Sequence, residues 1–195
     1  MVPALMDADW SVELGRNDPA LEFPWTSADG SRRYVDLLQS AESIGGIPEA
    51  EQYPELAECL RVLNTPDSPW RTVKCDVWIE RELDEAEQIY EATLKFCSYV
   101  DLIVRDVRKR FSFERHERFV KLAAQQLSDN DDQPVSCEFS VRRCWYHDEK
   151  PGADLSPGFY VTFCLFGYGN DEAEARVRWA RGLHRVTSLL IGLTP

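Results

Sequence analysis

The alternation of apolar and polar side chains is clearest from Pro134 to Tyr168, where it predicts two paired strands. In the first strand, apolar side chains occupy every second position: Val135, Cys137, Phe139 and Val141. This period of two is typical of a strand with one buried face. The second strand, from Phe159 to Phe166, has apolar or aromatic side chains on both faces, so we expect it centrally in a sheet. The loop between them, DEKPGADLSP, is polar and contains two prolines and a glycine, which predicts a chain reversal.

Other segments predict further extended structure. An alternation of the same kind runs through Val73, Cys75, Val77 and Ile79. The pattern from Phe96 to Arg105 fits either a strand or a long amphipathic helix. We expect a strand, because Phe, Tyr, Ile and two Val within ten residues favour extended backbone. Shorter extended candidates are Trp10–Leu14 and residues 21–25.

Three segments have the apolar spacing of amphipathic helices. The first begins at Pro54 and ends at Leu63, with proline in the first turn, where its missing N–H costs nothing. The second is capped by Ser112 and has an apolar side made by Phe113, His116, Val120, Ala123 and Leu127. The third is capped by Asn170 and stopped by Gly192, with an expected buried side made by Ala173, Val177, Ala180, His184 and Ile191.

From residue 71 onward, the predicted order is strand, short acidic helix (Glu82–Glu91), strand, helix, strand, strand, helix. This order predicts an α+β two-layer sandwich: a four-stranded, mostly antiparallel sheet with helices on one face. We therefore interpret residues 71–195 as the core domain. Asn64–Trp70, which is rich in turn residues, is the expected boundary.

Residues 1–70 contain seven of the eleven prolines, so we expect an irregular region with short elements. Its aromatic residues are too numerous for a disordered tail: Trp10, Phe23, Trp25, Tyr34 and Tyr53. We expect this region to pack on the core domain and to bury these rings.

The net charge of −12 is concentrated at the N-terminus. Residues 1–70 hold 13 Asp and Glu against 4 Lys and Arg, a net charge of −9, which leaves −3 for residues 71–195. Such a region repels a phosphate backbone and attracts a basic protein, so a nucleic-acid partner is disfavoured. There is no run of 18 apolar residues and no basic, apolar leader, which predicts a cytoplasmic protein without membrane contact.

The six cysteines are expected to be reduced. Four of them lie within predicted strands, where a free thiol behaves as a small apolar group. Cys144 and His147 form a C-x-x-H pair, but the sequence has no second close pair of ligands. We therefore predict neither a metal site nor another cofactor.

The candidate ligand-binding residues come mainly from the sheet face that would lie opposite the helices. They are Asp76, Trp78, Asp101, Glu138, Arg142 and Tyr160, with His147 beside the hairpin loop. Carboxylates, a cation and aromatic rings on one face of a sheet could form a ligand-binding surface, on which a carboxylate acts as a catalytic acid or base. The alternative is a partly solvated face whose charges pair across strands and whose rings are covered by residues 1–60.

Two other motifs have structural and functional interpretations. Arg142 and Arg143 could hold an anion, but alternation sends them to opposite faces, and pairing with nearby carboxylates explains them as well. Gly167 and Gly169 precede a helix, where phosphates often bind, yet Asp171 in the first turn would repel an anion. A tight strand-to-helix connection is the favoured interpretation of these glycines.

The sequence contains no marked nucleophile motif, so no catalytic residue is predicted. The leading hypothesis is a non-catalytic protein-binding or complex-subunit protein, such as an inhibitor or immunity protein. It would recognise a basic partner through the acidic, aromatic N-terminal third. The alternative is a small-molecule enzyme or ligand-binding domain that uses the outer sheet face through Asp76, Asp101, Glu138 and Tyr160. No oligomeric state is predicted.

Overall fold

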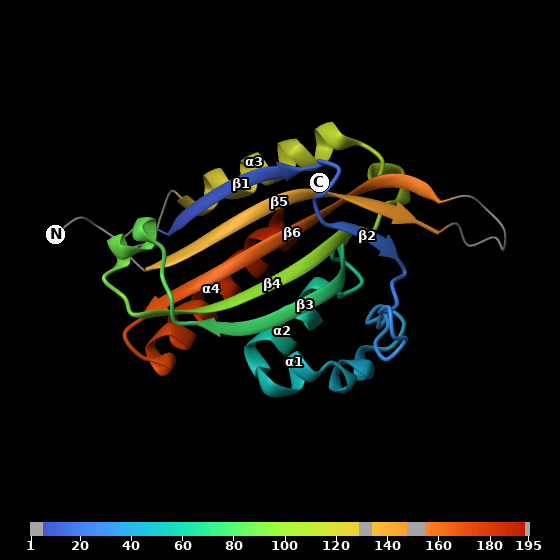
Figure 1. Ribbon diagram of the computed structural model, residues 1–195. Helices are drawn as coiled ribbons and strands as arrows, with labels where there is room; N and C mark the ends of the chain where they lie inside the picture. The colour runs from blue at the N-terminus through green and yellow to red at the C-terminus, as the bar shows by residue number, and fades with distance from the viewer. Residues whose placement is uncertain (1–5, 129–133, 148–154, 194–195) are drawn as a thin grey trace.

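The computed structural model describes residues 6–128, 134–147 and 155–193 of the chain. Its architecture is a single curved sheet with the long helices on one side (Figure 1). The strands are β1 (Asp7–Glu13), β2 (Ala20–Phe23), β3 (Trp70–Glu80), β4 (Leu94–Val104), β5 (Val135–Tyr146) and β6 (Ser156–Gly169). The α-helices are α1 (Pro48–Gln52), α2 (Pro54–Leu63), α3 (Phe113–Ser128) and α4 (Glu172–Gly192), and short 3₁₀ helices are η1 (Ala41–Gly46), η2 (Glu85–Tyr90) and η3 (Val107–Lys109).

The α+β class is confirmed, but the predicted number of four strands is wrong. Among the described residues the sheet has six strands, in the order β1-β5-β6-β4-β3, with β2 also paired to β5. β1 and β2 lie one after the other along the same edge of β5, and both run parallel to it. Asp7 pairs with Ser136 and Ala20 pairs with Arg143, so the partners are far apart in the chain and no local pattern indicates the pairing.

The segment with two possible interpretations, Phe96 to Arg105, is a strand as predicted. It forms most of β4, which lies between β3 and β6 and is antiparallel to both. Every residue of β4 except Tyr99 is buried. A strand buried on both faces has apolar residues at successive positions, which explains why its sequence also resembles one side of a helix.

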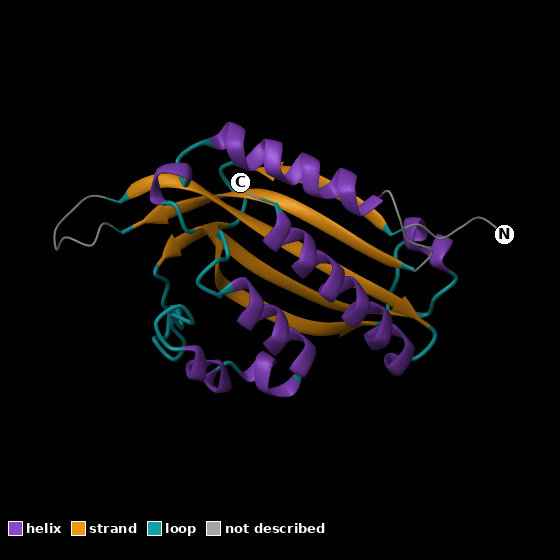
Figure 2. Cartoon of the chain, turned by 180° about the vertical axis from the view of Figure 1, so that it is seen from behind, coloured by secondary structure: helices purple, strands orange, loops and turns teal. Residues whose placement is uncertain are grey.

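The helices lie over one face of the sheet (Figure 2). α3 contacts β1, β5 and β6, α4 contacts β6, β4 and β5, and α2 packs beside α4. The interface between sheet and helices is filled by large side chains with almost no exposed surface, among them Trp70, Trp179, Phe139 and Phe163. The N-terminal third therefore contributes two edge strands and two helices to the same folded unit.

The predicted buried side of α4 is wrong. Val177 and Ile191 are 51% and 38% exposed, and His184 is exposed as well. The buried side consists of Ala175, Trp179, Gly182, Leu183, Val186, Thr187 and Leu190. Both sides of this helix carry apolar residues at helical spacing, and the sheet accepts the side that contains Trp179. The other predicted core histidine, His116, is buried on α3.

Gly167 and Gly169 explain how α4 lies so close to the sheet. Both are in β6, and a Cβ atom built on Gly167 would lie 2.3 Å from the backbone nitrogen of Trp179. A Cβ atom on Gly169 would lie 2.6 Å from the nitrogen of Ala175. These glycines therefore allow close backbone approach rather than an unusual turn. The cap of α4 is Asp171 and not Asn170, because the Asp171 carboxylate accepts the Glu174 N–H at 2.9 Å.

Two predicted connections lie mostly outside the described residues. They are the hairpin loop at 148–157 and the end of the preceding helix at 128–134. The two strands that the hairpin loop joins pair from Val135 with Gly167 to Tyr146 with Ser156, as the alternation predicts.

Candidate functional site

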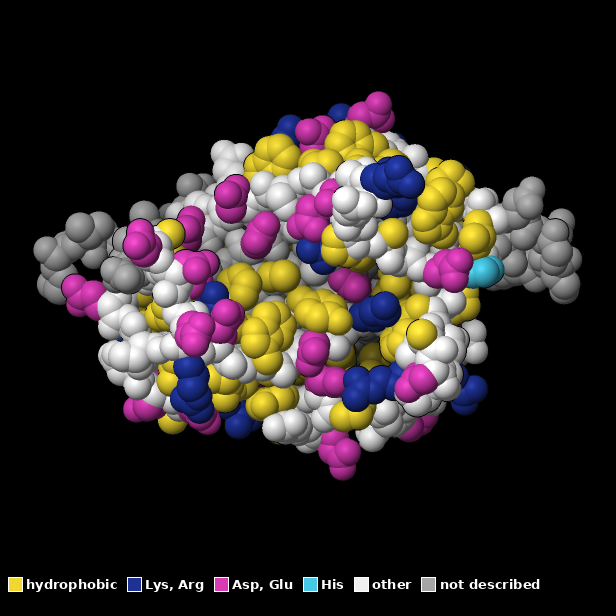
Figure 3. All heavy atoms as spheres, viewed as in Figure 1, with side chains coloured by type: hydrophobic (Ala, Val, Ile, Leu, Met, Phe, Trp, Pro, Cys, Tyr) yellow, Lys and Arg dark blue, Asp and Glu magenta, His cyan; other side chains and the backbone are white. Residues whose placement is uncertain are grey.

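The face of the sheet opposite the helices is open at its centre and covered at both ends (Figure 3). Trp78 is 37% exposed there, and Asp76 on the same strand and Glu138 on β5 are exposed as well. At one end, Leu21 and Phe23 of β2 pack with Trp25 and Tyr34 over the sheet residues Val73, Ile103, Cys144, Tyr146 and Tyr160. The predicted cover of residues 1–60 therefore extends over only one end of this face.

The cover at that end is held by polar contacts as well as by rings. The indole nitrogen Nε1 of Trp25 donates to the Val73 carbonyl at 2.8 Å, and the rings of Phe23 and Tyr34 meet edge to face at 4.8 Å. Burial raises the pKa of the Tyr34 phenol above its ordinary value, so this hydroxyl stays protonated at neutral pH.

The other end is covered by η2. The ring of Tyr90 stacks on that of Tyr168 with 4.0 Å between centroids. Glu87 accepts hydrogen bonds from Lys95 Nζ at 2.7 Å and from the Tyr168 hydroxyl at 2.8 Å. Burial is the largest single effect and would raise the pKa of Glu87, but the hydrogen bonds from Lys95, the Asp84 N–H and Tyr168 and the charge of Lys95 together outweigh it, and the pKa is lowered.

Across the open centre, residues from five strands form a row. The register aligns Asp9 with Glu138, Glu138 with Cys164, Cys164 with Tyr99, and Tyr99 with Asp76. Adjacent strands are about 4.8 Å apart, so Glu138 and Asp76, three strands apart, are separated by roughly 14 Å. This separation is too large for two carboxylates to act on one reacting bond.

The next row is polar and mostly buried. It consists of Ser11, Ser140, Thr162, Asp101 and Lys74. The Thr162 hydroxyl donates to Asp101 Oδ1 at 2.6 Å, and the Ser11 and Ser140 hydroxyls share a hydrogen bond at 2.9 Å. Burial raises the pKa of Asp101 to about 6, against the opposing effect of the Thr162 hydrogen bond.

Arg142 is bound to a carboxylate of its own. Its Nε and Nη2 donate to the two oxygens of Glu13 at 2.9 and 3.1 Å, and its Nη1 donates to Thr162 Oγ1 at 3.2 Å. Burial is the largest single effect and would raise the pKa of Glu13, but the hydrogen bonds from Arg142, Ser140 and Ser11 and the charge of Arg142 together outweigh it, and the pKa is lowered. This bidentate pair occupies the guanidinium, which accordingly contributes little free positive charge to the open face.

The exposed carboxylates of the open face have no such cation. Among the described residues, no Lys, Arg or His nitrogen lies within 4.0 Å of Asp7, Asp9, Asp76 or Glu138. The rings on this face include Trp78 and Tyr99, whose centroids are 6.4 Å apart, and Phe166, which lies two strands from Trp78 in the same row. We refer to these seven residues as the acidic open face: Asp7, Asp9, Asp76, Trp78, Tyr99, Glu138 and Phe166.

The structure places the predicted site residues in three different settings. Asp76, Trp78 and Glu138 belong to the acidic open face. Asp101 and Tyr160 point to the same side of the sheet but are only 5% and 3% exposed. His147 follows β5 beyond the covered end, where its Nε2 lies 3.8 Å from Glu22 at the surface, far from the row that contains Glu138.

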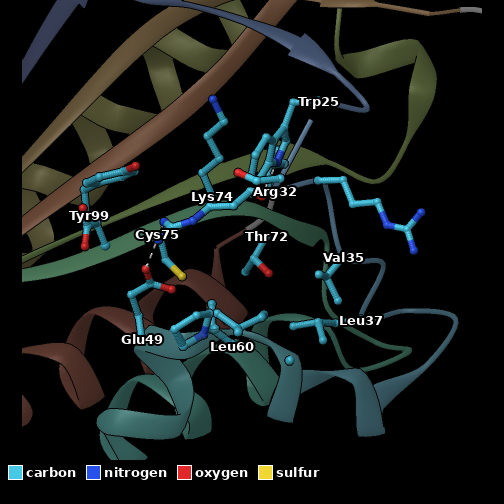
Figure 4. Close-up of a pocket in the computed structure, with 17 residues that line it drawn as sticks. Trp25, Arg32, Val35, Leu37, Glu49, Leu60, Thr72, Lys74, Cys75 and Tyr99 are labelled. Atoms are coloured by element: carbon cyan, nitrogen blue, oxygen red, sulfur yellow. Dashed lines mark hydrogen bonds and ion pairs between the residues drawn. The ribbon is translucent and has the colours of Figure 1, made fainter. Parts of the chain in front are cut away.

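A cavity of about 650 Å³ lies beside β3, and the sequence did not indicate it (Figure 4). Its lining combines the strand residues Thr72 to Asp76 with parts of the irregular segment 25–49. In Figure 4, Trp25, Lys74 and Tyr99 lie above the strand, and Leu37, Leu60 and Glu49 lie below it. The apolar residues of the segment, such as Val35, Leu37 and Ile47, were the only signal in the sequence, and they have no regular period.

All six cysteines are free, and burial raises the pKa of each thiol above its ordinary value. The pKa of the Cys59 thiol, for example, is raised to about 12. In the described parts of the chain, no three His, Cys, Asp or Glu side chains are grouped so that they could hold a metal ion. Within the same residues, each helix is too short or too polar to cross a membrane.

Comparisons with protein-family models, with curated proteins and with solved structures returned no significant match. The candidate sites are therefore argued from geometry and charge alone.

Proposed function

We propose that the protein is a non-catalytic binding protein that recognises a basic protein partner through the acidic open face. The observation that carries this proposal is a set of four carboxylates that have no cationic partner among the described residues and that lie on the same face of the sheet as an exposed tryptophan. The proposal keeps the acidic, aromatic character expected from the sequence. It moves the contact surface from the N-terminal third to the centre of the sheet, to which that third contributes Asp7 and Asp9.

The open face has the composition of a recognition surface. Trp78 and Tyr99 are large amphipathic rings on rigid strands, so little conformational entropy is lost when a partner contacts them. Asp76 and Glu138 lie on either side of Tyr99 in the same row, and Trp78 lies in the next row, two residues along β3 from Asp76. Lysine and arginine side chains of a partner would pair with the carboxylates and stack on the rings.

The same geometry gives less support to the alternative hypothesis, a small-molecule enzyme or ligand-binding domain that uses the outer sheet face. Of the four residues in that hypothesis, Asp101 and Tyr160 are buried, and only Asp76 and Glu138 reach solvent. The two exposed carboxylates belong to strands that are not neighbours. A small substrate requires a concave site, and the lining of the cavity beside β3 includes Asp76 but not Asp101, Glu138 or Tyr160, so these four residues do not share one such site.

The proposal is tested by capturing partners from the source organism at low and high salt. The bait proteins are wild type, W78A and the double variant D76N/E138Q. We expect a protein of high isoelectric point to be retained by wild type at low salt and to bind both variants at least about fivefold more weakly. The affinity of the purified pair, measured by calorimetry, should fall as salt rises.

The matched control is E58Q/E114Q, which removes two exposed carboxylates from α2 and α3 on the other side of the molecule. It changes the net charge by the same amount as D76N/E138Q. If the control weakens binding as much as D76N/E138Q, the effect is one of overall charge and the proposed surface is wrong. Retention of no protein at either salt concentration would also contradict the proposal.

A further inference from the structure

The cavity beside β3 follows the free edge of the sheet. Five successive residues of this strand, Thr72 to Asp76, contribute to its lining. Successive side chains of a strand point to opposite faces, so only a space along the strand edge is lined by all of them. β3 is the last strand of the sheet, and the opposite wall is formed by the segment from Ser31 to Glu49.

Backbone groups along this edge already have side-chain partners. The Thr72 N–H donates to Asn64 Oδ1 at 3.2 Å, and the Val77 N–H donates to Asp76 Oδ1 at 2.8 Å. The Val73 carbonyl accepts from Trp25. An added peptide strand would have to displace these contacts, so the edge is protected against strand pairing and the cavity is suited to a small molecule.

The size and the walls of the cavity define the body of that molecule. A volume of about 650 Å³ lies within the range of small-molecule sites. Below the strand the wall contains the aliphatic side chains of Leu37 and Leu60 beside Glu49, and above it the wall carries the rings of Trp25 and Tyr99. Such walls favour an aromatic or branched apolar group.

The charges of the cavity lining indicate which polar group the bound molecule carries. Three cations, Arg32, Arg33 and Lys74, face two carboxylates, Glu49 and Asp76, which leaves a net charge of +1 in a protein of net charge −12. Arg32 lies 3.8 Å from Glu49. In the described part of the chain, Arg33 and Lys74 have no carboxylate within 4.0 Å, and Lys74 Nζ lies 4.8 Å from the centroid of the Trp25 ring.

We propose that this cavity binds a small organic monocarboxylate with an aromatic or branched apolar body. Arg33 and Lys74 hold the carboxylate, and the body lies between the rings and the aliphatic wall. A monoanion is favoured over a phosphate dianion, because the excess charge of the lining is a single positive charge. The cavity adjoins the proposed protein contact, and Asp76 and Tyr99 belong to both.

The test uses 1-naphthoate, its neutral analogue 1-naphthamide and inorganic phosphate as probes of the full-length chain. Binding is followed by the indole N–H signals in ¹⁵N-labelled protein, with the Trp25 signal assigned by W25F. We expect 1-naphthoate to shift the Trp25 signal and to bind about tenfold more tightly than 1-naphthamide. Phosphate at the same concentration should leave the signal unchanged.

Variants separate the cavity from the charge of the whole protein. K74M and R33Q should each weaken 1-naphthoate binding about tenfold and leave 1-naphthamide binding unchanged. R61Q removes the same charge from the exposed side of α2 and should change the affinity less than about twofold. V35W, which fills the cavity, should abolish binding of both naphthalene probes.

Three results would overturn the proposal: no binding of 1-naphthoate, equal binding of the acid and the amide, or an R61Q effect as large as that of K74M. Partner capture by the acidic open face is measured separately, with W78A and E138Q, which leave the cavity lining intact. Failure of one proposal is therefore distinguishable from failure of the other.

Discussion

Thr162 donates its hydroxyl to the carboxylate of Asp101 at 2.6 Å, in the interior of the sheet and away from solvent. The hydroxyl also accepts a hydrogen bond from Arg142 Nη1 at 3.2 Å. The carboxylate is thus joined through one hydroxyl to the ion pair between Arg142 and Glu13. The contact connects three neighbouring strands through side chains, in addition to the backbone ladder.

The ionisation of Asp101 should make stability depend on pH. Burial raises the pKa of this carboxyl from 3.8 to about 6 in the folded state, so between these values the folded state binds more protons than the unfolded state. The contribution of Asp101 to the free energy of unfolding is therefore fully present below pH 3.8 and is lost as the pH rises through about 6. The loss is on the order of 2–3 kcal/mol.

The variant D101N isolates this effect, because its amide oxygen still accepts the Thr162 hydroxyl but does not ionise. We expect D101N to be more stable than wild type at pH 7 by about 1–3 kcal/mol, and the difference to disappear near pH 4. Urea unfolding at a series of pH values measures it. A difference that is constant with pH would contradict a raised pKa for Asp101.

The ion pair between Glu13 and Arg142 should show the opposite dependence on pH. The folded-state pKa of Glu13 is lowered from 4.5, so its contribution is present above pH 4.5 and is lost as the pH falls through the folded-state value. E13Q should cost about 1–3 kcal/mol at pH 7, because it leaves a half-buried guanidinium without its counter-charge.

The exposed pair between Arg61 and Glu58 provides the control for this measurement. Their side chains are 52% and 68% exposed, so E58Q should cost less than about 0.5 kcal/mol. Equal losses for E13Q and E58Q would show that burial does not strengthen the edge contact between β1 and β5.

Gly167 should tolerate no side chain. In G167A the new Cβ atom would meet the backbone of Trp179 and Ala175, which neither a rotamer change nor a small shift can relieve. We expect a loss of about 3 kcal/mol or more in the free energy of unfolding, measured by urea denaturation. G45A is the matched control, because a Cβ atom there has no heavy atom within 4 Å.

Ser98 should contribute through a single buried hydrogen bond. Its Oγ accepts the indole N–H of Trp179 at 2.8 Å, and neither residue has measurable exposure. S98A leaves that N–H buried without a partner, which should cost about 1–3 kcal/mol in thermal or urea unfolding. The exposed S188A, whose hydroxyl bonds only to the backbone of its own helix, should change stability by less than about 0.5 kcal/mol.

Local patterns were sufficient to predict the long elements of this protein. The segments of β3 and β5 have apolar residues at a period of two, those of β4 and β6 are rich in β-branched and aromatic residues, and α2 has the predicted bounds Pro54–Leu63. α4 was predicted as a helix but with the wrong buried side. Helical spacing identifies a helix with apolar residues on two sides, yet only the glycines of the adjacent strand decide which side packs.

The candidate sites depended more heavily on the folded chain. Alternation correctly assigned Asp76, Trp78 and Glu138 to the side opposite the helices, because side-chain direction along a strand follows from sequence position. It did not show that Asp101 and Tyr160 on that side are buried. Tyr160 is buried because β2 and the following loop bring Phe23 and Trp25 over the sheet. Asp101 lies between Lys74 and Thr162 of the neighbouring strands.

The sequence by itself determined the α+β class, the antiparallel strands after residue 70 and the acidic character of the chain, since each depends on local spacing or on composition. Only the tertiary structure decided the strand order, the edge pairing of β1 and β2 with β5, and the cavity beside β3. These features join segments that are distant in the chain, and the backbone hydrogen bonds and packing that join them leave no periodic signal in the residues.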